Sequence, residues 1–186
     1  MKKRTALISV ILAVSLLLAA GAGVTVAYLV SQSLTLENTF TYGDVSITLE
    51  ESPVKEYLLL PGAEITKDPT ITVKGGSDAC WLFFKAEPSS DFSKYMTYTP
   101  AEGWKALSGA SGVYYRIAEA TKTDVSYGII EGNRVAVHDT VTEEELELIR
   151  IKPTLTFTAY AVQFAEIDTA EEAWDILKEE QLNEAA

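Results

Sequence analysis

The sequence predicts a mainly β fold: a jelly-roll-like antiparallel β-sandwich with one or two short helices, preceded by an N-terminal helical signal segment. Beyond residue 43, apolar residues recur with a period of two in several short runs, as in strands with one buried face. Gly, Pro and Asp separate these runs, as they do in turns. The start of the chain instead has the composition of a secretory signal.

The N-terminal segment has the parts of a secretory signal peptide. Its positive start consists of three basic residues, Lys2, Lys3 and Arg4. Residues 6–30 carry no charge, and small-x-small cleavage patterns end at Ala22 and at Ala27. Retention as a membrane anchor is the alternative to cleavage, because the uncharged stretch reaches the about 20 residues that span a bilayer.

The remaining chain has the size of one domain. The predicted parts are a signal peptide over residues 1–27, an N-terminal arm over 28–42, and a β-sandwich over 43–186 that includes a C-terminal helix over 169–182. The arm is small and polar, with a weak apolar alternation at Leu34 and Leu36. It therefore predicts either a flexible leader or an extended strand.

The charge of the chain is strongly negative. Its 186 residues include 27 Asp and Glu against 15 Lys and Arg, which gives a net charge of −12. An anionic surface repels phosphate backbones and anionic lipid head groups, so nucleic acid is excluded as a partner and the membrane is expected only through the signal segment. Solubility outside a cell explains this charge more simply than a cation site does.

Alternating apolar and polar residues predict the strands of the domain. In residues 44–50, Val45, Ile47 and Leu49 would face a core. Further strands are predicted over residues 70–74, 80–87, 112–118, 134–138 and 152–164. The last of these runs is apolar or Thr on both faces, which predicts a central position in its sheet.

A less regular segment lies between the predicted strands, over residues 92–110. Its aromatic residues Tyr95, Tyr98 and Trp104 are interpreted as cross-strand pairs or loop packing, with ligand stacking as the alternative.

Two capping boxes predict helices near the C-terminus, Thr142 with Glu145 and Thr169 with Glu172. The second precedes an apolar stripe with helical spacing, formed by Ala170, Ala173, Trp174 and Leu177. We expect this stripe to pack on the sheet.

Residue types that carry catalysis are scarce. Cys80 is the single cysteine and lies in an apolar run, which predicts a buried thiol rather than a nucleophile. His138 is the single histidine, whereas a hydrolytic zinc site needs three protein ligands that are usually rich in His. Its neighbour Asp139 would point to the opposite face of a strand, so the two do not form a base and its orienting group. We predict no catalytic residue, cofactor or metal.

Acidic residues also gather between positions 143 and 147. A calcium site is one interpretation, but no Asp-x-Asp-x-Asp-Gly loop is present and ligands at helical spacing diverge around the axis. A solvated helix face is the interpretation that we favour.

Several features together resemble one known family. They are the small residue Ala27 followed by the aromatic Tyr28, the run over residues 38–50, the run over 60–73, and the late segment 157–163. In this set the chain resembles the TasA/camelysin group of exported proteins of Gram-positive bacteria. The motif residues that carry the resemblance are Gly43, Pro61, Gly62, Lys67, Asp68 and Pro69.

The resemblance implies a jelly-roll sandwich that the signal peptidase SipW releases by cleavage between Ala27 and Tyr28. It also implies a secreted subunit of the cell surface or biofilm matrix. The best-known members polymerise into fibres by lending an N-terminal strand to the next subunit, which is β-augmentation. Here Leu34, Leu36 and Phe40 would belong to the donor strand, and the partners would be other copies or related matrix subunits.

Two other functions remain open at this point. The family name also covers a metallo-endopeptidase label, which would require a metal site that one histidine does not supply. A monomeric module that binds the cell surface is the second alternative.

Overall fold

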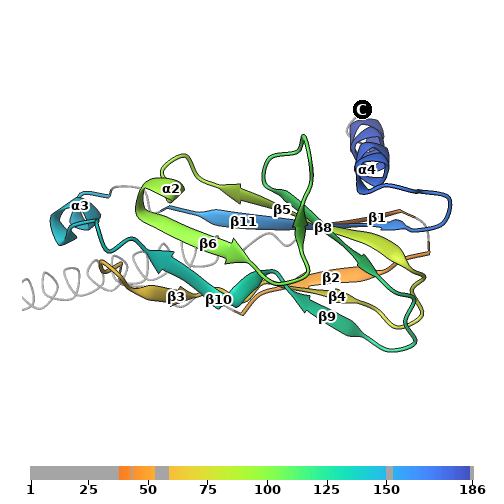
Figure 1. Cartoon of the computed structure of the whole chain (residues 1–186), viewed down its shortest axis with the longest axis horizontal. Helices are drawn as coiled ribbons and strands as arrows, with labels where there is room; N and C mark the ends of the chain where they lie inside the picture. The colour runs from red at the N-terminus through yellow and green to blue at the C-terminus, as the bar shows by residue number, and fades with distance from the viewer. Residues whose placement is uncertain (1–37, 43, 53–58, 150–152, 185–186) are drawn as a thin grey trace, which may run out of the picture. The chain divides into compact units, whose positions relative to one another are not determined.

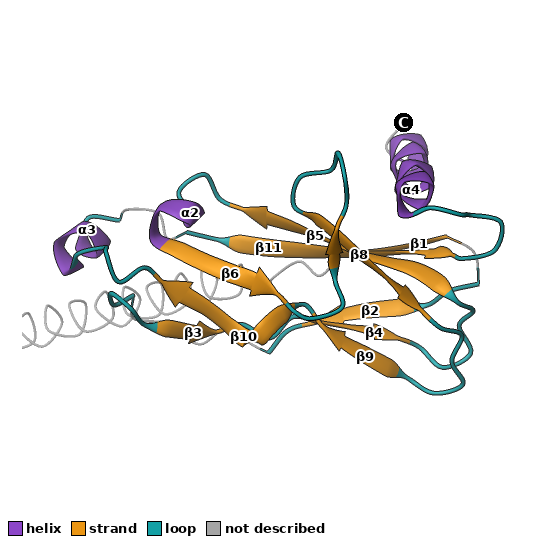
Figure 2. Ribbon diagram, viewed as in Figure 1, coloured by secondary structure: helices purple, strands orange, loops and turns teal. Residues whose placement is uncertain are grey.

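The computed structural model describes residues 38–42, 44–52, 59–149 and 153–184. The strands in these ranges are β1 Asn38–Tyr42, β2 Ile47–Glu50, β3 Glu64–Thr66, β4 Thr70–Val73, β5 Cys80–Pro88, β6 Met96–Pro100, β7 Lys105–Ala106, β8 Val113–Ala118, β9 Val125–Gly128, β10 Ile130–Val137 and β11 Leu155–Gln163. The helices are α2 Phe92–Tyr95, α3 Glu143–Glu147 and α4 Ala170–Glu184. The described chain is therefore mainly β, as predicted (Figure 2).

The strands form three sheets (Figure 1). The largest has five strands in the order β1-β11-β5-β8-β7, and two smaller sheets have the orders β3-β10-β6 and β2-β4-β9. All the strand pairs in these sheets are antiparallel except that of β1 with β11, which is parallel.

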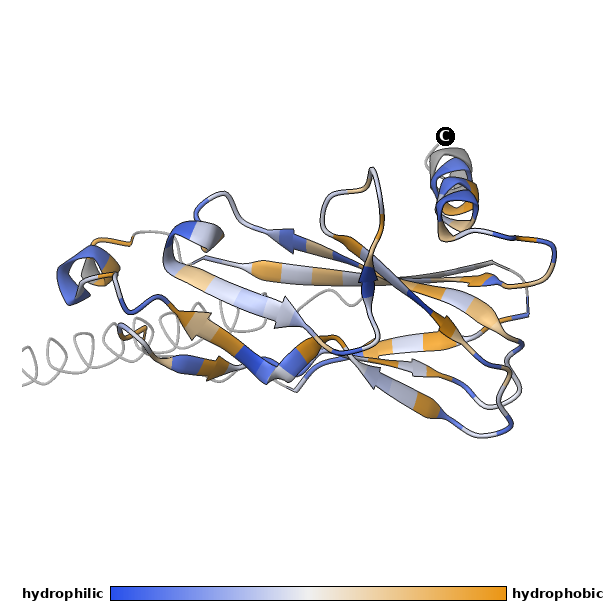
Figure 3. Cartoon of the chain, viewed as in Figure 1, coloured by the Kyte–Doolittle hydropathy of each residue, from blue (hydrophilic) through white to orange (hydrophobic). Residues whose placement is uncertain are grey.

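One face of the five-stranded sheet packs against both smaller sheets. The shared core contains alternate residues of β5 and β11 together with inward-facing residues of the small sheets; its largest fully buried members are Phe84, Phe157, Ile71, Leu82, Ile129 and Ile130. Figure 3 shows the corresponding alternation of hydrophobic and paler positions along β2 and β11. This burial is the main stabilising term of the domain.

The other face of the five-stranded sheet is covered in part by α4. Ala173 and Leu177 are buried in a second apolar cluster with Phe83, Tyr160 and Val162 of the sheet. The ring centroid of Trp174 lies 5.0 Å from that of Tyr160 and 5.3 Å from that of Phe83. The helix begins as predicted, because Thr169 Oγ1 accepts a hydrogen bond from Glu172 N.

The strongest sequence patterns are confirmed. The strand predicted over residues 80–87 is β5, and the one over 152–164 is β11, which has neighbours on both sides as its two apolar faces required. The capping box of Thr142 and Glu145 begins α3. The alternating sequence did not identify the short strands β3, β6, β7 and β9.

Several predictions fall outside the described residues. These are the signal peptide over 1–27, the cleavage alternatives Ala22, Ala27 and Tyr28, and most of the arm, including Leu34 and Leu36. Within the described ranges, no helix combines the length and apolar character needed to cross a membrane.

Candidate functional site

The N-terminal strand β1 lies at an edge of the five-stranded sheet, where its neighbour is β11. The parallel register runs from Asn38 beside Thr158 to Tyr42 beside Val162, and it places Phe40 of the predicted donor segment beside Tyr160. A strand of five residues with one neighbour is held by few backbone hydrogen bonds. The start of the described chain is therefore attached to the domain through a sheet edge.

The edge that β1 covers belongs to a long and mostly buried strand, β11. β11 pairs with β5 over nine residues, from Leu155 to Gln163, and both of its faces are mostly buried. Without β1, a row of N–H and C=O groups of β11 would lose its partners. These groups could then pair with another extended chain. The fold thus provides a preformed acceptor for one strand.

The motif residue Lys67 joins the segment between β3 and β4 to the segment after β2. Its Nζ lies 2.8 Å from Glu51 Oε1 and 2.9 Å from Oε2. The side chains are only 16% and 6% exposed, respectively. The ammonium also lies 5.5 Å from the ring centroid of Phe157, within the range of a cation–π contact.

The next motif residue, Asp68, makes a second connection between the same segments. Its Oδ2 accepts a hydrogen bond from Ser52 Oγ at 2.6 Å, and its Oδ1 accepts one from Ser52 N at 2.9 Å. The Ser52 hydroxyl is the main cause that lowers the pKa of the Asp68 carboxyl below its ordinary value. Asp68 is therefore ionised at neutral pH and holds Ser52 in place.

The other described motif residues contribute to packing and to a turn. Pro69 is fully buried, and its carbonyl accepts a hydrogen bond from Ile129 N at 3.0 Å. Pro61 and Gly62 form the predicted turn, in which Gly62 has a φ of +70° that favours glycine. Gly43 lies outside the described residues. Among the described motif residues, Lys67 and Asp68 thus join the two ends of residues 51–68.

The two residues that could suggest catalysis lie on different elements: Cys80 begins β5, and His138 follows β10. Cys80 is 0% exposed, and burial raises the pKa of its thiol to about 12, so thiolate is scarce at neutral pH. His138 places its Nε2 3.2 Å from the carbonyl oxygen of Ser93. No group of three or more His, Cys, Asp or Glu side chains within the described ranges is placed to hold a metal ion.

The acidic run over 143–147 forms the whole of α3. Glu145 accepts hydrogen bonds from Thr142 N and Oγ1, at 3.0 and 3.1 Å, which lowers the pKa of its carboxyl. A carboxylate in this role caps the helix and complements its dipole.

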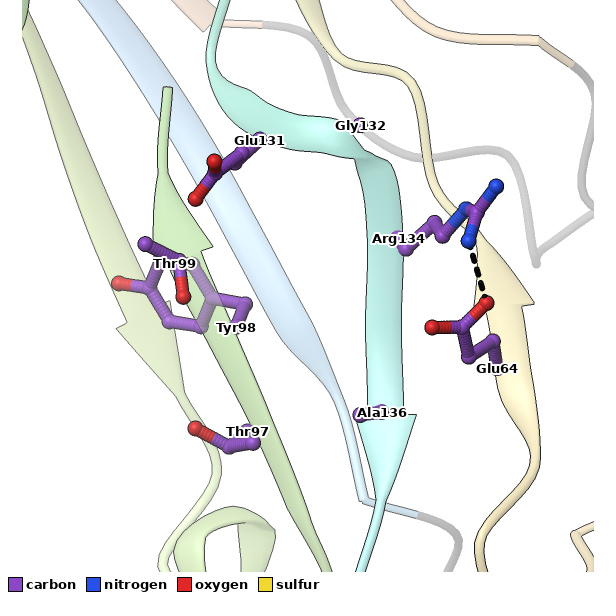
Figure 4. A pocket seen from close by; sticks show the side chains of 8 residues that line it. All are labelled: Glu64, Thr97, Tyr98, Thr99, Glu131, Gly132, Arg134 and Ala136. Carbon is purple, nitrogen blue, oxygen red and sulfur yellow. Dashed lines mark hydrogen bonds and ion pairs between the residues drawn. The ribbon is translucent and has the colours of Figure 1, made fainter. Parts of the chain in front are cut away.

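A shallow hollow of about 310 Å³ lies on the β3-β10-β6 sheet (Figure 4). It lies where the register of β6 and β10 shifts between Ile130 and Val135. Gly132 and Asn133 have positive φ angles of 59° and 55° there, which is typical of a bulge. These positions could not be predicted from alternation, because a bulge interrupts it.

The chemistry of this hollow is that of a polar surface. Arg134 Nη1 lies 2.6 Å from Glu64 Oε2, so these charges neutralise each other across two strands. Thr97 and Thr99 line the side formed by β6. Burial raises the pKa of Tyr98 to about 12, so its hydroxyl stays neutral at pH 7. The lining of the hollow contains no His, Cys or Lys side chain.

Comparison of the chain with protein-family models, with curated proteins and with solved structures gave no match.

Proposed function

We propose that this chain is a secreted, non-catalytic structural subunit of the cell surface or biofilm matrix of a Gram-positive bacterium. In this proposal its sandwich is a jelly roll of the TasA/camelysin type, and SipW removes the signal by cleavage between Ala27 and Tyr28. The observation that carries the proposal is the position of β1, an N-terminal strand held at a sheet edge by one neighbour.

This position favours assembly through the N-terminal arm. β1 begins at Asn38 beside Thr158, so residues 28–37 would leave the domain at the edge of the five-stranded sheet. An extended segment of ten residues spans at most about 35 Å, which is enough to reach a neighbouring subunit. Leu34 and Leu36, two residues apart, would point to one side of such a strand and supply its apolar contacts. Other copies, or related matrix subunits, are the proposed partners.

The described contacts also favour a non-catalytic role. Lys67, Asp68 and Pro69 are engaged in packing and in hydrogen bonds that close a loop. The Cys80 thiol is buried with a raised pKa. These are features of a stable building block rather than of a site that turns over substrate.

The test compares the processed protein with a variant that lacks residues 28–37 and keeps β1. We expect fibres of the processed protein in electron micrographs and none for the deletion variant, with the β circular dichroism spectrum of both unchanged. Equal fibre formation by both proteins would refute donation by the arm. A processed protein that stays monomeric at high concentration and binds cell walls would instead support the surface-binding module.

A further inference from the structure

One end of the five-stranded sheet carries exposed apolar side chains. The sheet register places Ile117, Trp81, Val162 and Tyr42 in one row across β8, β5, β11 and β1. Ile117 is 44% exposed, and Phe164, directly after β11, is 37% exposed. The ring centroid of Phe164 lies 5.2 Å from that of Trp81, so these side chains are contiguous. We call Trp81, Ile117 and Phe164 the end patch.

The strand β1 is connected to the rest of the domain at this same end. Its last residue, Tyr42, pairs with Val162, and Gly43 alone separates Tyr42 from Asp44 in the sequence. The carbonyl of Asp44 accepts a hydrogen bond from Asp78 N at 3.2 Å, which ties Asp44 to the domain. Two residues of extended chain span at most about 7 Å. The domain must therefore lie next to whichever strand β1 pairs with.

This connection decides what an exchange of β1 between copies can build. If β1 of one copy pairs with β11 of a second, Tyr42 of the first copy lies beside Val162 of the second, and Asp44 follows two residues later. Each copy therefore gives away β1 and accepts a partner's β1 on β11 at the same end of its domain. A donor and an acceptor at opposite ends would give an open chain of subunits, whereas this arrangement favours a reciprocal exchange with two-fold symmetry.

We propose that two copies of this chain form a closed dimer by exchanging β1, and that the end patches become buried between the two domains. The exchange restores the five residue pairs of the register from Asn38 to Tyr42, so its cost in backbone hydrogen bonds is small. Gly43 alone separates β1 from Asp44 in the sequence, and short hinge segments are where strand exchange occurs. Burial of Ile117 and Phe164 adds an apolar contact that the monomer lacks. The dimer is distinct from the fibre, which uses residues 28–37 at the other end of β1.

A cysteine pair at one register position tests the exchange. Asn38→Cys and Thr158→Cys are introduced together into the processed protein, since neighbouring strands bring such residues within disulfide distance. After refolding at increasing concentration and oxidation, we expect a non-reducing gel to show a dimer band that grows with concentration and no larger species. Cross-linked monomer at every concentration, or a ladder beyond the dimer, would overturn the proposal.

Two variants of the cross-linking protein test the end patch. Ile117→Ser with Phe164→Ser should lower the dimer yield at a given concentration by roughly tenfold, because the exposed apolar contact is lost. Leu60→Ser with Leu148→Ser is the matched control; these side chains are 43% and 72% exposed, and neither belongs to the end patch. Equal yields from the two double variants would refute the role of the end patch.

The proposal of a dimer and the proposal of a fibre can be refuted independently. In the variant without residues 28–37, the cross-linked dimer should persist, because Asn38 and β1 remain, while fibres disappear. Loss of the dimer in that variant would show that the arm holds the copies together, and would overturn the exchange of β1.

Discussion

Lys67 and Asp68 are neighbours in the sequence and bind two other neighbours, Glu51 and Ser52. Each pair of contacts spans sixteen positions of the chain. The two interactions differ in exposure, since Lys67 and Glu51 are nearly buried whereas the bonds of Asp68 to Ser52 are exposed. They should therefore respond differently to mutation and to pH.

Substitution Lys67→Met should destabilise the domain by on the order of 3 kcal/mol, because it removes a cation that lies 2.8 Å from a carboxylate that is 6% exposed. Urea unfolding measures this change. Adding Glu51→Gln to Lys67→Met should recover part of the loss, since no charge then remains buried at this position.

The matched control for this ion pair is Lys74→Met. Lys74 pairs with Asp124 at 3.1 Å, but the side chains are 37% and 56% exposed. Its loss should cost less than about 1 kcal/mol. Equal destabilisation by both substitutions would contradict the importance of burial for the Lys67 pair.

The contact of Asp68 with Ser52 should make stability depend on pH. The folded state lowers the pKa of this carboxyl below 3.8, so its contribution is complete above that pH and is lost as the pH falls through the folded value. Ser52→Ala should raise the pKa of Asp68 towards 3.8 and lower the free energy of unfolding at pH 7 by about 1 kcal/mol. The difference between the proteins should shrink once Asp68 is protonated in both.

Ser126→Ala is the control for this pH dependence. The Ser126 hydroxyl lies 2.8 Å from that of Thr72, a neutral partner, so any loss of stability should be the same on both sides of pH 3.8. Carboxyl NMR shifts report the pKa of Asp68 directly. An unchanged pKa in Ser52→Ala would contradict the assigned cause.

At the scale of elements, the apolar stripe of α4 packs on an apolar face of the five-stranded sheet. Its apolar stripe was predicted from helical spacing, and in the structure Leu177 is 2% exposed in the cluster that covers Phe83. The sheet face beneath it is apolar as well, which explains why both faces of β5 and β11 are hydrophobic.

Leu177→Ala should therefore destabilise the domain by about 3 kcal/mol through loss of burial and the cavity left behind. Thermal or urea unfolding measures the loss, and near-ultraviolet circular dichroism should report a changed environment of Trp174. Glu179→Ala, at an exposed position of the same helix, should change stability by less than about 0.5 kcal/mol. Similar values for the two variants would mean that the stripe does not support the sheet.

The elements differ in how far they could be predicted. β5, β11 and α4 have long apolar patterns, so local spacing was sufficient to identify them. β3 and β7 have three and two residues, and alternation cannot be detected over such short lengths. β10 was predicted only over its last residues, because the bulge at Gly132 and Asn133 breaks its period.

The contacts of the motif residues were harder to predict than the elements. The Pro61–Gly62 turn follows from local backbone preferences. The partners Glu51 and Ser52 do not, because one sequence gives no information on which of its many carboxylates meets Lys67. Opposite charges near the two ends of one loop were the available signal, and it is weak in a chain with 27 acidic residues.

For the whole molecule, the five-stranded sheet is the common support of both apolar clusters. β5 lies at its centre and contributes Phe84 to one cluster and Phe83 to the other. Opening of either face therefore exposes residues of the same strand, so we expect the described domain to unfold as one cooperative unit. Cys80, the first residue of β5, provides a probe of this event.

Labelling of Cys80 by a thiol reagent should require global unfolding, because the thiol is 0% exposed and burial raises its pKa to about 12. The native protein should resist the reagent, and in urea the labelled fraction should rise with the same midpoint as the circular dichroism signal. Leu148→Cys is the control: it places a second thiol at a position that is 72% exposed, outside the end patch, and should label at once in the folded protein. Labelling of Cys80 at a urea concentration well below the circular dichroism midpoint would show that the start of β5 opens before the domain unfolds. In that case the start of β5 would belong to a less stable unit, and the single cooperative domain would be wrong.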